Sequence, residues 1–174
     1  MKLLFVDCDG AIREPASGEQ FIQHPKDQRI IVGADKAVVH YRRQGWTIIG
    51  VTNQGGVAAG FKSIEDAIAE QRYTLEIFPD IFWICFCPDF EGKTAYIVTR
   101  KKVQQFTRGL TRELFASFRK PGHGMIELVT SEFLKGGMSV DSSYLMVGDR
   151  PEDEQCAAAA GIDFLWAHIW RQYG

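Results

Sequence analysis

The sequence contains no apolar run that approaches the roughly 20 residues needed to cross a membrane. Its first apolar stretch, residues 3–6, ends at Asp7, so it is too short for the apolar core of a secretory signal peptide. The four cysteines are irregularly spaced, unlike those of a disulfide framework. We therefore expect a protein of the reducing cytoplasm that makes no contact with a membrane.

Internal repeats and low-complexity tracts are also missing, and so is the glycine-rich Walker A motif of many kinases. The 174 residues suit a single domain, and 45% of them are hydrophobic, enough for a sizeable core. Charge is distributed unevenly: the net charge is −2, but residues 93–120 hold eight lysines and arginines against one acid, Glu113. Such a stretch is typical either of a solvated helix face or of a surface that binds anions.

Runs of apolar residues alternate with helical patterns along the chain. The runs at 2–6, 46–52, 81–87, 144–147 and 164–167 predict strands, with a further short strand at 95–99. Helices are predicted at 35–44, from Ser63 to just before Pro79, at 110–118, at 125–135 and at 151–160. Strands that are apolar throughout indicate a parallel sheet covered on both faces. The sequence therefore predicts an α/β fold.

Polar side chains follow several predicted strands at the point where each strand ends. Asp7 and Asp9 follow the first strand, Thr52 and Asn53 the second, and Asp149 the fourth. Ligands bind at the carboxyl edge of an open parallel sheet, so we expect these groups to share one site. Taken alone, the Asp7 segment is typical of an acidic turn. Beside the other groups it predicts a site for Mg²⁺, which prefers oxygen ligands.

The turn after the second strand adds hydrogen-bond donors. Residues 52–56 offer a hydroxyl, an amide and the backbone N–H groups of a glycine-rich turn, which together can cradle a phosphate. Lys120 supplies a positive charge that neutralises a carboxylate and the phosphate oxygens. These groups predict phosphate chemistry at the carboxylate site.

Four segments carry a family resemblance. They are Asp7-Cys8-Asp9-Gly10, Thr52-Asn53, Lys120-Pro121 and Gly148-Asp149-Arg150-Pro151-Glu152-Asp153. In this order they resemble the four motifs of the haloacid dehalogenase superfamily. The longer strings VTNQGGVAAG, RKPGHGM and VGDRPEDEQCAAAAG resemble the branch that contains histidinol-phosphate phosphatase, heptose bisphosphate phosphatase and the 3′-phosphatase domain of polynucleotide kinase-phosphatase. The resemblance spans residues 2 to about 167.

The resemblance implies a fold and a domain organisation. The expected fold is a three-layer, Rossmann-like α/β structure with a central parallel sheet and no large cap domain. Residues 1–174 are expected to form one phosphatase domain. Within it, we expect residues 11–33 to form a flap and residues 88–118 a basic insertion on the substrate side.

The resemblance also implies a role for each motif residue. Asp7 is the expected nucleophile, which forms an aspartyl-phosphate, and Asp9 the expected general acid and base. Asp7, the Asp9 backbone carbonyl and Asp149 are the expected Mg²⁺ ligands, supported by Asp153. Thr52 and Asn53 are expected to bind the phosphoryl group, Lys120 to stabilise its charge, and Arg119 to contact the substrate.

The chain departs from the family pattern in two places. Ala11 stands where many relatives have threonine, which removes one supporting hydroxyl. Sugar- and histidinol-phosphate phosphatases of this branch often carry a zinc loop, but here Cys87-Pro88 is followed by Asp89. Cys85 and Cys87 alone cannot complete a four-ligand site. We expect two buried core cysteines and no zinc.

The basic segment bears on the substrate. Four aromatic residues, Tyr96, Phe106, Phe115 and Phe118, are interleaved with its cations, which is typical of a groove for single-stranded nucleic acid. The alternative is that the aromatics are core and the cations solvated. Because polynucleotide 3′-phosphatases lack the zinc loop, we expect a Mg²⁺-dependent phosphomonoesterase acting on a nucleic-acid 3′ end. The alternatives are a small-molecule phosphatase, of the sugar bisphosphate or histidinol phosphate type, and a non-catalytic binding module. The sequence predicts no oligomeric state.

Overall fold

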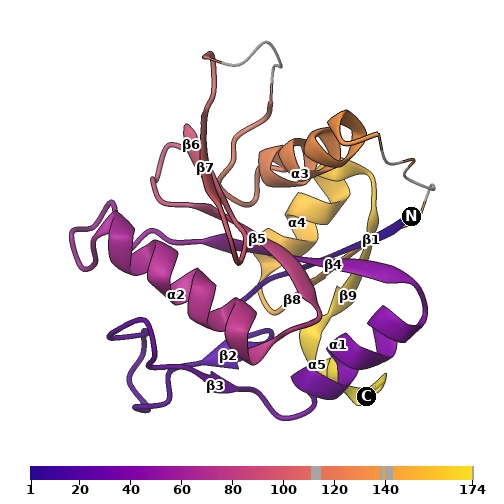
Figure 1. The fold of residues 1–174 in the computed structure, drawn as a ribbon, viewed down its shortest axis with the longest axis horizontal. Helices are drawn as coiled ribbons and strands as arrows, with labels where there is room; N and C mark the ends of the chain where they lie inside the picture. The colour runs from indigo at the N-terminus through magenta and orange to yellow at the C-terminus, as the bar shows by residue number, and fades with distance from the viewer. Residues whose placement is uncertain (111–114, 138, 140–142, 174) are drawn as a thin grey trace.

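The computed structural model describes residues 1–110, 115–137, 139 and 143–173. Its centre is a seven-stranded sheet (Figure 1). The strands are β1 (Lys2–Val6), β4 (Trp46–Asn53), β5 (Ile81–Cys87), β6 (Thr94–Val98), β7 (Val103–Thr107), β8 (Tyr144–Gly148) and β9 (Asp163–Trp166), in the spatial order β7-β6-β5-β4-β1-β8-β9. The strands β5, β4, β1, β8 and β9 are parallel, as their continuous apolar sequences predicted.

Helices cover both faces of this sheet (Figure 1). On one face α3 (Gly124–Lys135) and α4 (Pro151–Ala160) pack over Leu3 and Phe5 of β1. On the other face α1 (Ala34–Arg43), α2 (Ile64–Ile77) and α5 (Ala167–Trp170) pack over Leu4 and Val6, and the short 3₁₀ helix η1 (Arg171–Tyr173) follows α5. Alternate residues of β1 therefore serve two separate cores, and the expected three-layer α/β fold is confirmed.

The edge of the sheet beyond β5 differs from the prediction. The strand expected at 95–99 is β6, but it runs antiparallel to β5 and is followed by a second antiparallel strand, β7. The sequence VQQFT of β7 does not read as a buried strand, because Gln104 and Gln105 are both exposed at the sheet edge. The sheet is thus parallel in its centre and antiparallel at one edge.

The helix predicted at 110–118 is wrong in the part that the structure describes. Residues 111–114 lie outside the described residues, while Leu110 is in a turn and residues 115–118 are not helical. Phe115 and Phe118 are three residues apart, as on a helix face, yet both are buried from an irregular loop. The backbone N–H of Phe118 donates to the carbonyl of Gly92, 2.9 Å away.

The segment between β1 and α1 contains little regular structure. Its two short strands, β2 (Arg13–Glu14) and β3 (Arg29–Ile30), pair with each other and not with the main sheet. The backbone leaves this segment through Gly33, which precedes α1. Among the described residues, no helix is both long and apolar enough to span a membrane.

Candidate active site

The motif side chains meet at the carboxyl edge of the parallel strands. Asp7 follows β1, Thr52 and Asn53 end β4, and Asp149 follows β8. These three strands are neighbours, since β1 pairs with both β4 and β8. Lys120 reaches the same point from the loop that precedes α3. The sequence placed these groups at one edge, and the structure brings them together there.

Lys120 lies between two carboxylates. Its Nζ atom donates to Asp7 Oδ1 at 2.5 Å, to Asp153 Oδ1 at 2.6 Å and to the Val51 carbonyl at 3.0 Å. All three charged side chains are less than a tenth exposed. Burial alone would lower the pKa of Lys120, but Asp7 and Asp153 raise it above its ordinary value. The ammonium is therefore charged and fixes the rotamer of Asp7.

Asn53 holds the backbone of Lys120. Its Nδ2 donates to the Lys120 carbonyl and its Oδ1 accepts from the Lys120 N–H, both at 3.0 Å. The next peptide bond, between Lys120 and Pro121, is cis. The side chain of Asn53 is thus committed to the lysine loop.

Three carboxylates form a cluster with oxygen atoms within 4.8 Å of one another: Asp7, Asp149 and Asp153. Asp153 is already satisfied by protein donors, because its Oδ2 accepts from the N–H groups of Asp149 and Arg150, each at 3.1 Å, and its Oδ1 from Lys120. Burial raises the pKa of Asp7 well above its ordinary value, and the negative charge of Asp153 raises it further. One ammonium among three carboxylates leaves negative charge that a divalent cation would balance, so the donor set fits Mg²⁺.

Two glycines permit this close packing of carboxylates. Gly10 has φ +89°, and a Cβ there would lie 2.2 Å from Asp149 Oδ2. A Cβ on Gly148 would lie 2.2 Å from the Cβ of Asp153. Any larger residue at either position would displace an acid of the cluster.

Asp9 has different partners from those of Asp7. Its Oδ2 accepts from Thr52 Oγ1 at 3.2 Å and from Gln54 Nε2 at 2.9 Å, while its Oδ1 accepts from Arg13 Nε at 2.9 Å. The Asp9 side chain is 38% exposed, so one edge remains open to a substrate. Desolvation alone would raise its pKa, but the charge of Arg13 holds the pKa of Asp9 below its ordinary value.

Arg119 lies beside the glycine-rich turn. Its guanidinium stacks over the exposed ring of Phe90, 5.2 Å from the ring centre. A Cβ on Gly55 would lie 3.0 Å from the Phe90 ring and 3.2 Å from Arg119, so a glycine there lets both side chains approach the turn. Among the described residues, Arg119 NH1 has no hydrogen-bond partner although the atom is buried.

Comparison with known proteins identifies the family. A family model described as polynucleotide kinase 3 phosphatase matches residues 2–167. The chain belongs to this family. The resemblance to phosphatases of the haloacid dehalogenase superfamily is thereby confirmed, and the chain is an enzyme of that type.

The curated relatives of this phosphatase include proteins named as sugar bisphosphate phosphatases. The D-glycero-alpha-D-manno-heptose-1,7-bisphosphate 7-phosphatase of Photorhabdus laumondii is 30% identical over 166 residues, covering 93% of this chain and 79% of the relative. The D-glycero-D-manno-heptose-1,7-bisphosphate 7-phosphatase of Chlorobaculum tepidum is 29% identical over 171 residues, covering 92% of this chain and 75% of the relative.

Solved structures share the fold of this phosphatase. A putative HAD-like phosphatase from Mesorhizobium loti has a TM-score of 0.68 at 22% identity, over 93% of this chain and 69% of that one. The D,D-heptose 1,7-bisphosphate phosphatase from B. bronchiseptica was solved with magnesium and phosphate. It has a TM-score of 0.62 at 23% identity, over 94% of this chain and 79% of that one.

Cys85 and Cys87 are core residues, as the sequence predicted. Cys85 and Cys87 are fully buried in the core beneath α3. Burial raises the pKa of Cys87 to about 12. Asp89 follows Cys87-Pro88, where the zinc-loop pattern has histidine. Its carboxylate closes the loop before β6 by accepting from the N–H groups of Lys93 and Thr94 at 2.9 and 2.8 Å.

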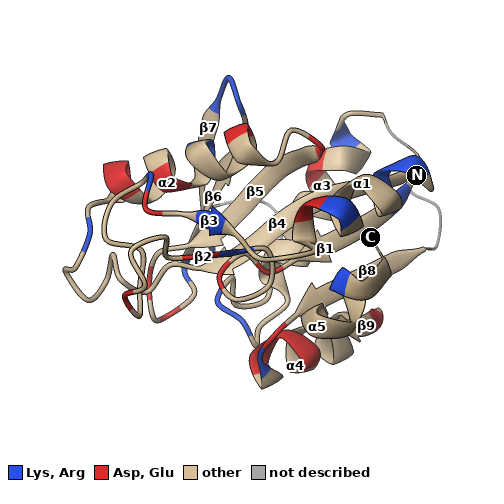
Figure 2. Ribbon diagram, turned by 90° about the horizontal axis from the view of Figure 1, so that it is seen from below, with Lys and Arg blue, Asp and Glu red and all other residues tan. Residues whose placement is uncertain are grey.

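The basic segment does not form the continuous groove that we expected. Because β6 runs antiparallel to β5, the turn at 99–102 lies on the side of the sheet opposite the carboxyl ends of the parallel strands. In Figure 2 its lysines and arginine form the blue turn beyond β7. Arg100 there donates to the carbonyls of Leu75, Phe78, Pro79 and Ile81, which join the end of α2 to the start of β5. Arg112 is outside the described residues.

The interleaved aromatic residues are core residues. Phe106, Phe115 and Phe118 are less than a tenth exposed, and Tyr96 stacks on Phe86 with ring centres 5.1 Å apart. The alternative interpretation of the sequence, in which the aromatics are core, is the correct one. Within this part of the described chain, Lys120 contacts the active-site carboxylates, and Arg119 lies beside the glycine-rich turn.

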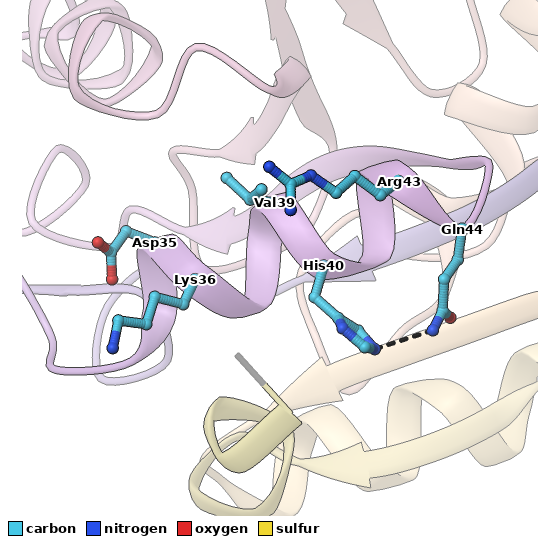
Figure 3. A pocket seen from close by; sticks show the side chains of 6 residues that line it. All are labelled: Asp35, Lys36, Val39, His40, Arg43 and Gln44. Carbon is cyan, nitrogen blue, oxygen red and sulfur yellow. Dashed lines mark hydrogen bonds between the residues drawn. The ribbon is translucent and has the colours of Figure 1, made fainter.

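A surface hollow runs along α1, far from the motif residues. Its lining comes from that helix and its C-cap residue: Asp35, Lys36, Val39, His40, Arg43 and Gln44 (Figure 3). His40 and Gln44 interact at 2.9 Å. A binding site is normally lined by several elements, but this hollow is lined by one helix face. It is therefore an irregularity of the surface and not a candidate site.

Sequence reasoning missed Arg13 and Gln54, which bind Asp9. Gln54 was visible only as part of the glycine-rich turn, and Arg13 as one charge in an irregular segment. The signal was a charged residue four positions after Asp9, but nothing in the sequence indicates that it is completely buried.

Proposed function

We propose that the chain is a Mg²⁺-dependent phosphomonoester hydrolase that acts through an aspartyl-phosphate on Asp7. The observation that carries this proposal is the buried Lys120, held between Asp7 and Asp153. A lysine in this position neutralises the nucleophile and holds one of its two carboxylate oxygens.

The proposed reaction has two half-reactions. In the first, Asp7 attacks phosphorus, the bond from phosphorus to the leaving oxygen breaks, and Asp9 gives that oxygen its proton. In the second, Asp9 takes a proton from water, which attacks phosphorus and releases inorganic phosphate from Asp7. In both half-reactions Thr52, at the end of β4, would donate a hydrogen bond to the phosphoryl group. Asn53 would act by holding the backbone of Lys120.

The metal would be held by Asp7, Asp149 and the Asp9 backbone carbonyl. When bound, Mg²⁺ would supply charge neutralisation and orientation for the phosphoryl oxygens. Asp153 would support it by fixing the backbone of Asp149.

The substrate that we propose is a small phosphorylated molecule of the sugar bisphosphate type. The sugar bisphosphatases among the curated relatives support this choice. So does the guanidinium of Arg119, which lies beside the phosphate turn and offers donors for a second anionic group. The family description leaves a polynucleotide 3′ end as the second candidate. The basic turn at 99–102 is at the wrong edge to guide it.

Three further features belong to the proposal. Residues 1–174 act as one phosphatase domain, the segment 11–33 forms a flap beside Asp9, and the segment 88–118 supplies the substrate side through Phe90. We place the enzyme in the cytoplasm.

Hydrolysis of p-nitrophenyl phosphate with and without Mg²⁺ tests the mechanism, with Asp7→Asn as the control. Activity of the unchanged protein that equals that of Asp7→Asn contradicts it. Heptose 1,7-bisphosphate, histidinol phosphate and a 3′-phosphorylated oligonucleotide, assayed side by side, test the substrate. A kcat/KM for the oligonucleotide above that for both small esters overturns the sugar assignment.

A further inference from the structure

Asp9 belongs to a closed ring of side-chain hydrogen bonds and ion pairs. Arg13 binds Asp9 and Glu70, Lys62 binds Glu70 and Gln54, and Gln54 returns to Asp9. The successive distances, starting from Asp9, are 2.9 Å to Arg13, 2.8 Å on to Glu70, 2.5 Å to Lys62, 3.1 Å to Gln54 and 2.9 Å back to Asp9. The two acidic and the two basic side chains of the ring cancel in charge, and the side-chain amide of Gln54 closes it.

The ring joins segments that are far apart in sequence. Arg13 comes from β2, Gln54 from the turn after β4, Lys62 from the loop before α2, and Glu70 from the middle of α2. Arg13 is completely buried and the Glu70 side chain is 3% exposed. Burying charges costs free energy even when they are paired. Apolar side chains in their place would hold these segments together equally well. The burial of paired charge here therefore calls for an explanation other than holding the segments together.

The ring fixes both carboxylate oxygens of Asp9. Oδ1 accepts from Arg13, and Oδ2 accepts from Gln54 and Thr52. Arg13 is itself immobile, because its NH1 also donates to Gln28 Oε1 at 3.3 Å and to Thr74 Oγ1. With its oxygens held, Asp9 keeps one orientation toward the open side of the site.

We propose that Arg13, locked by Glu70, is a positioning residue that orients Asp9 for proton transfer to the leaving oxygen. This inference rests on the proposed role of Asp9 as general acid. Arg13 does not contact the substrate. It acts through Asp9, and a displacement of about 1 Å in a catalytic group can cost on the order of 100-fold in rate.

The test compares leaving groups. An alkyl leaving oxygen, as in glycerol 2-phosphate, needs a proton as its bond to phosphorus breaks, whereas p-nitrophenolate leaves as a stable anion. Arg13→Lys keeps a buried cation for Glu70 but cannot also reach Asp9 through Nε. We expect kcat/KM, which reports only the half-reaction that expels the leaving group, to fall about 100-fold for glycerol 2-phosphate and only about threefold for p-nitrophenyl phosphate. Arg13→Gln is expected to act in the same direction.

Arg100→Gln is the matched control, since Arg100 also makes several structural hydrogen bonds but none to the site. We expect it to lower the melting temperature and to leave the ratio of the two activities unchanged. An equal loss of kcat/KM on both substrates in Arg13→Lys overturns the proposal. If neither Arg13 variant folds, as judged by circular dichroism, the arginine is a purely structural residue and the proposal also fails.

The two proposals fail in different ways. If the unchanged enzyme hydrolyses p-nitrophenyl phosphate no faster than Asp7→Asn, the proposed function is wrong. If the unchanged enzyme is active and Arg13→Lys keeps its leaving-group ratio, only the role of Arg13 is wrong.

Discussion

Asn53 and Lys120 exchange two hydrogen bonds of 3.0 Å, from the side chain of one residue to the backbone of the other. They are 67 residues apart in sequence and belong to different motifs. Asn53, the residue after Thr52, therefore sets the backbone from which the lysine reaches Asp7. Two motifs that resemble separate binding elements act as one unit.

Replacing Asn53 tests this unit. Asn53→Ala leaves the N–H and carbonyl of Lys120 without their partners, and each unmade hydrogen bond costs about 1–3 kcal/mol. We expect the free energy of unfolding to fall by that order and kcat to fall with it. Urea denaturation and p-nitrophenyl phosphate assays measure both. Asn53→Asp keeps the acceptor and loses the donor, so its effects are expected to be smaller. Unchanged activity in Asn53→Ala would contradict the coupling.

Lys120 is expected to stabilise the fold as well as the reaction. Lys120→Met leaves Asp7 and Asp153 buried beside each other without a cation, and breaking a buried ion pair costs about 3–5 kcal/mol. We expect activity to be lost and the melting temperature to fall. Added Mg²⁺ should restore part of that temperature, because a divalent cation also neutralises the cluster. Lys101→Met, at an exposed position, is the control. A Mg²⁺ effect of the same size in both variants would show that the ion acts elsewhere.

The arrangement of the motifs was predictable because each one follows an apolar strand. The strand that precedes Asp7 is apolar throughout, which indicates a parallel sheet, and parallel strands bring their carboxyl ends to one edge. The N-cap of α2 was also predictable, because it is formed by residues close together in sequence. Ser63 Oγ accepts from the N–H of Asp66 at 3.0 Å.

The structural features that the sequence did not predict depend on contacts between residues far apart in the chain. Phe115 and Phe118 carry helical spacing, but the core beneath α3 holds them in an irregular loop. Arg100 belongs to a basic run, yet the antiparallel direction of β6 carries it away from the site. The burial of Arg13 depends on Glu70, 57 residues later. Composition and periodicity carry no information on such pairings.

The turn at 99–102 offers a test of nucleic-acid binding. We expect a variant with Lys101 and Lys102 changed to glutamine to keep the kcat/KM of the unchanged enzyme for every phosphomonoester, because these cations lie at the edge opposite the site. Binding to a single-stranded oligonucleotide, measured by fluorescence anisotropy at several salt concentrations, should show the same salt slope in both proteins. A slope that becomes shallower by roughly one unit per cation removed would instead show that the turn contacts phosphates.

Asp27 is expected to make the segment 11–33 sensitive to acid. Its carboxylate accepts from the N–H of Gln23 at 3.0 Å, and from the N–H and hydroxyl of Ser17 at 2.7 and 2.8 Å. These bonds, the one from Gln23 first, hold the pKa of Asp27 below its ordinary value. A lowered pKa in the folded state stabilises the protein above the unfolded pKa of about 3.9, and this contribution is lost as the pH falls through the folded value.

Asp27→Asn should therefore be less stable than the unchanged protein at pH 7, and the difference should shrink as the pH falls below about 4. Urea midpoints between pH 3 and pH 7 measure it, and Glu19→Gln, an exposed acid of the same segment, is the control. Hydrogen exchange should locate the loss of protection in residues 15–28, beside Arg13. A stability difference that grows as the pH falls would contradict the assigned role, because it would mean that the folded state raises the pKa of Asp27.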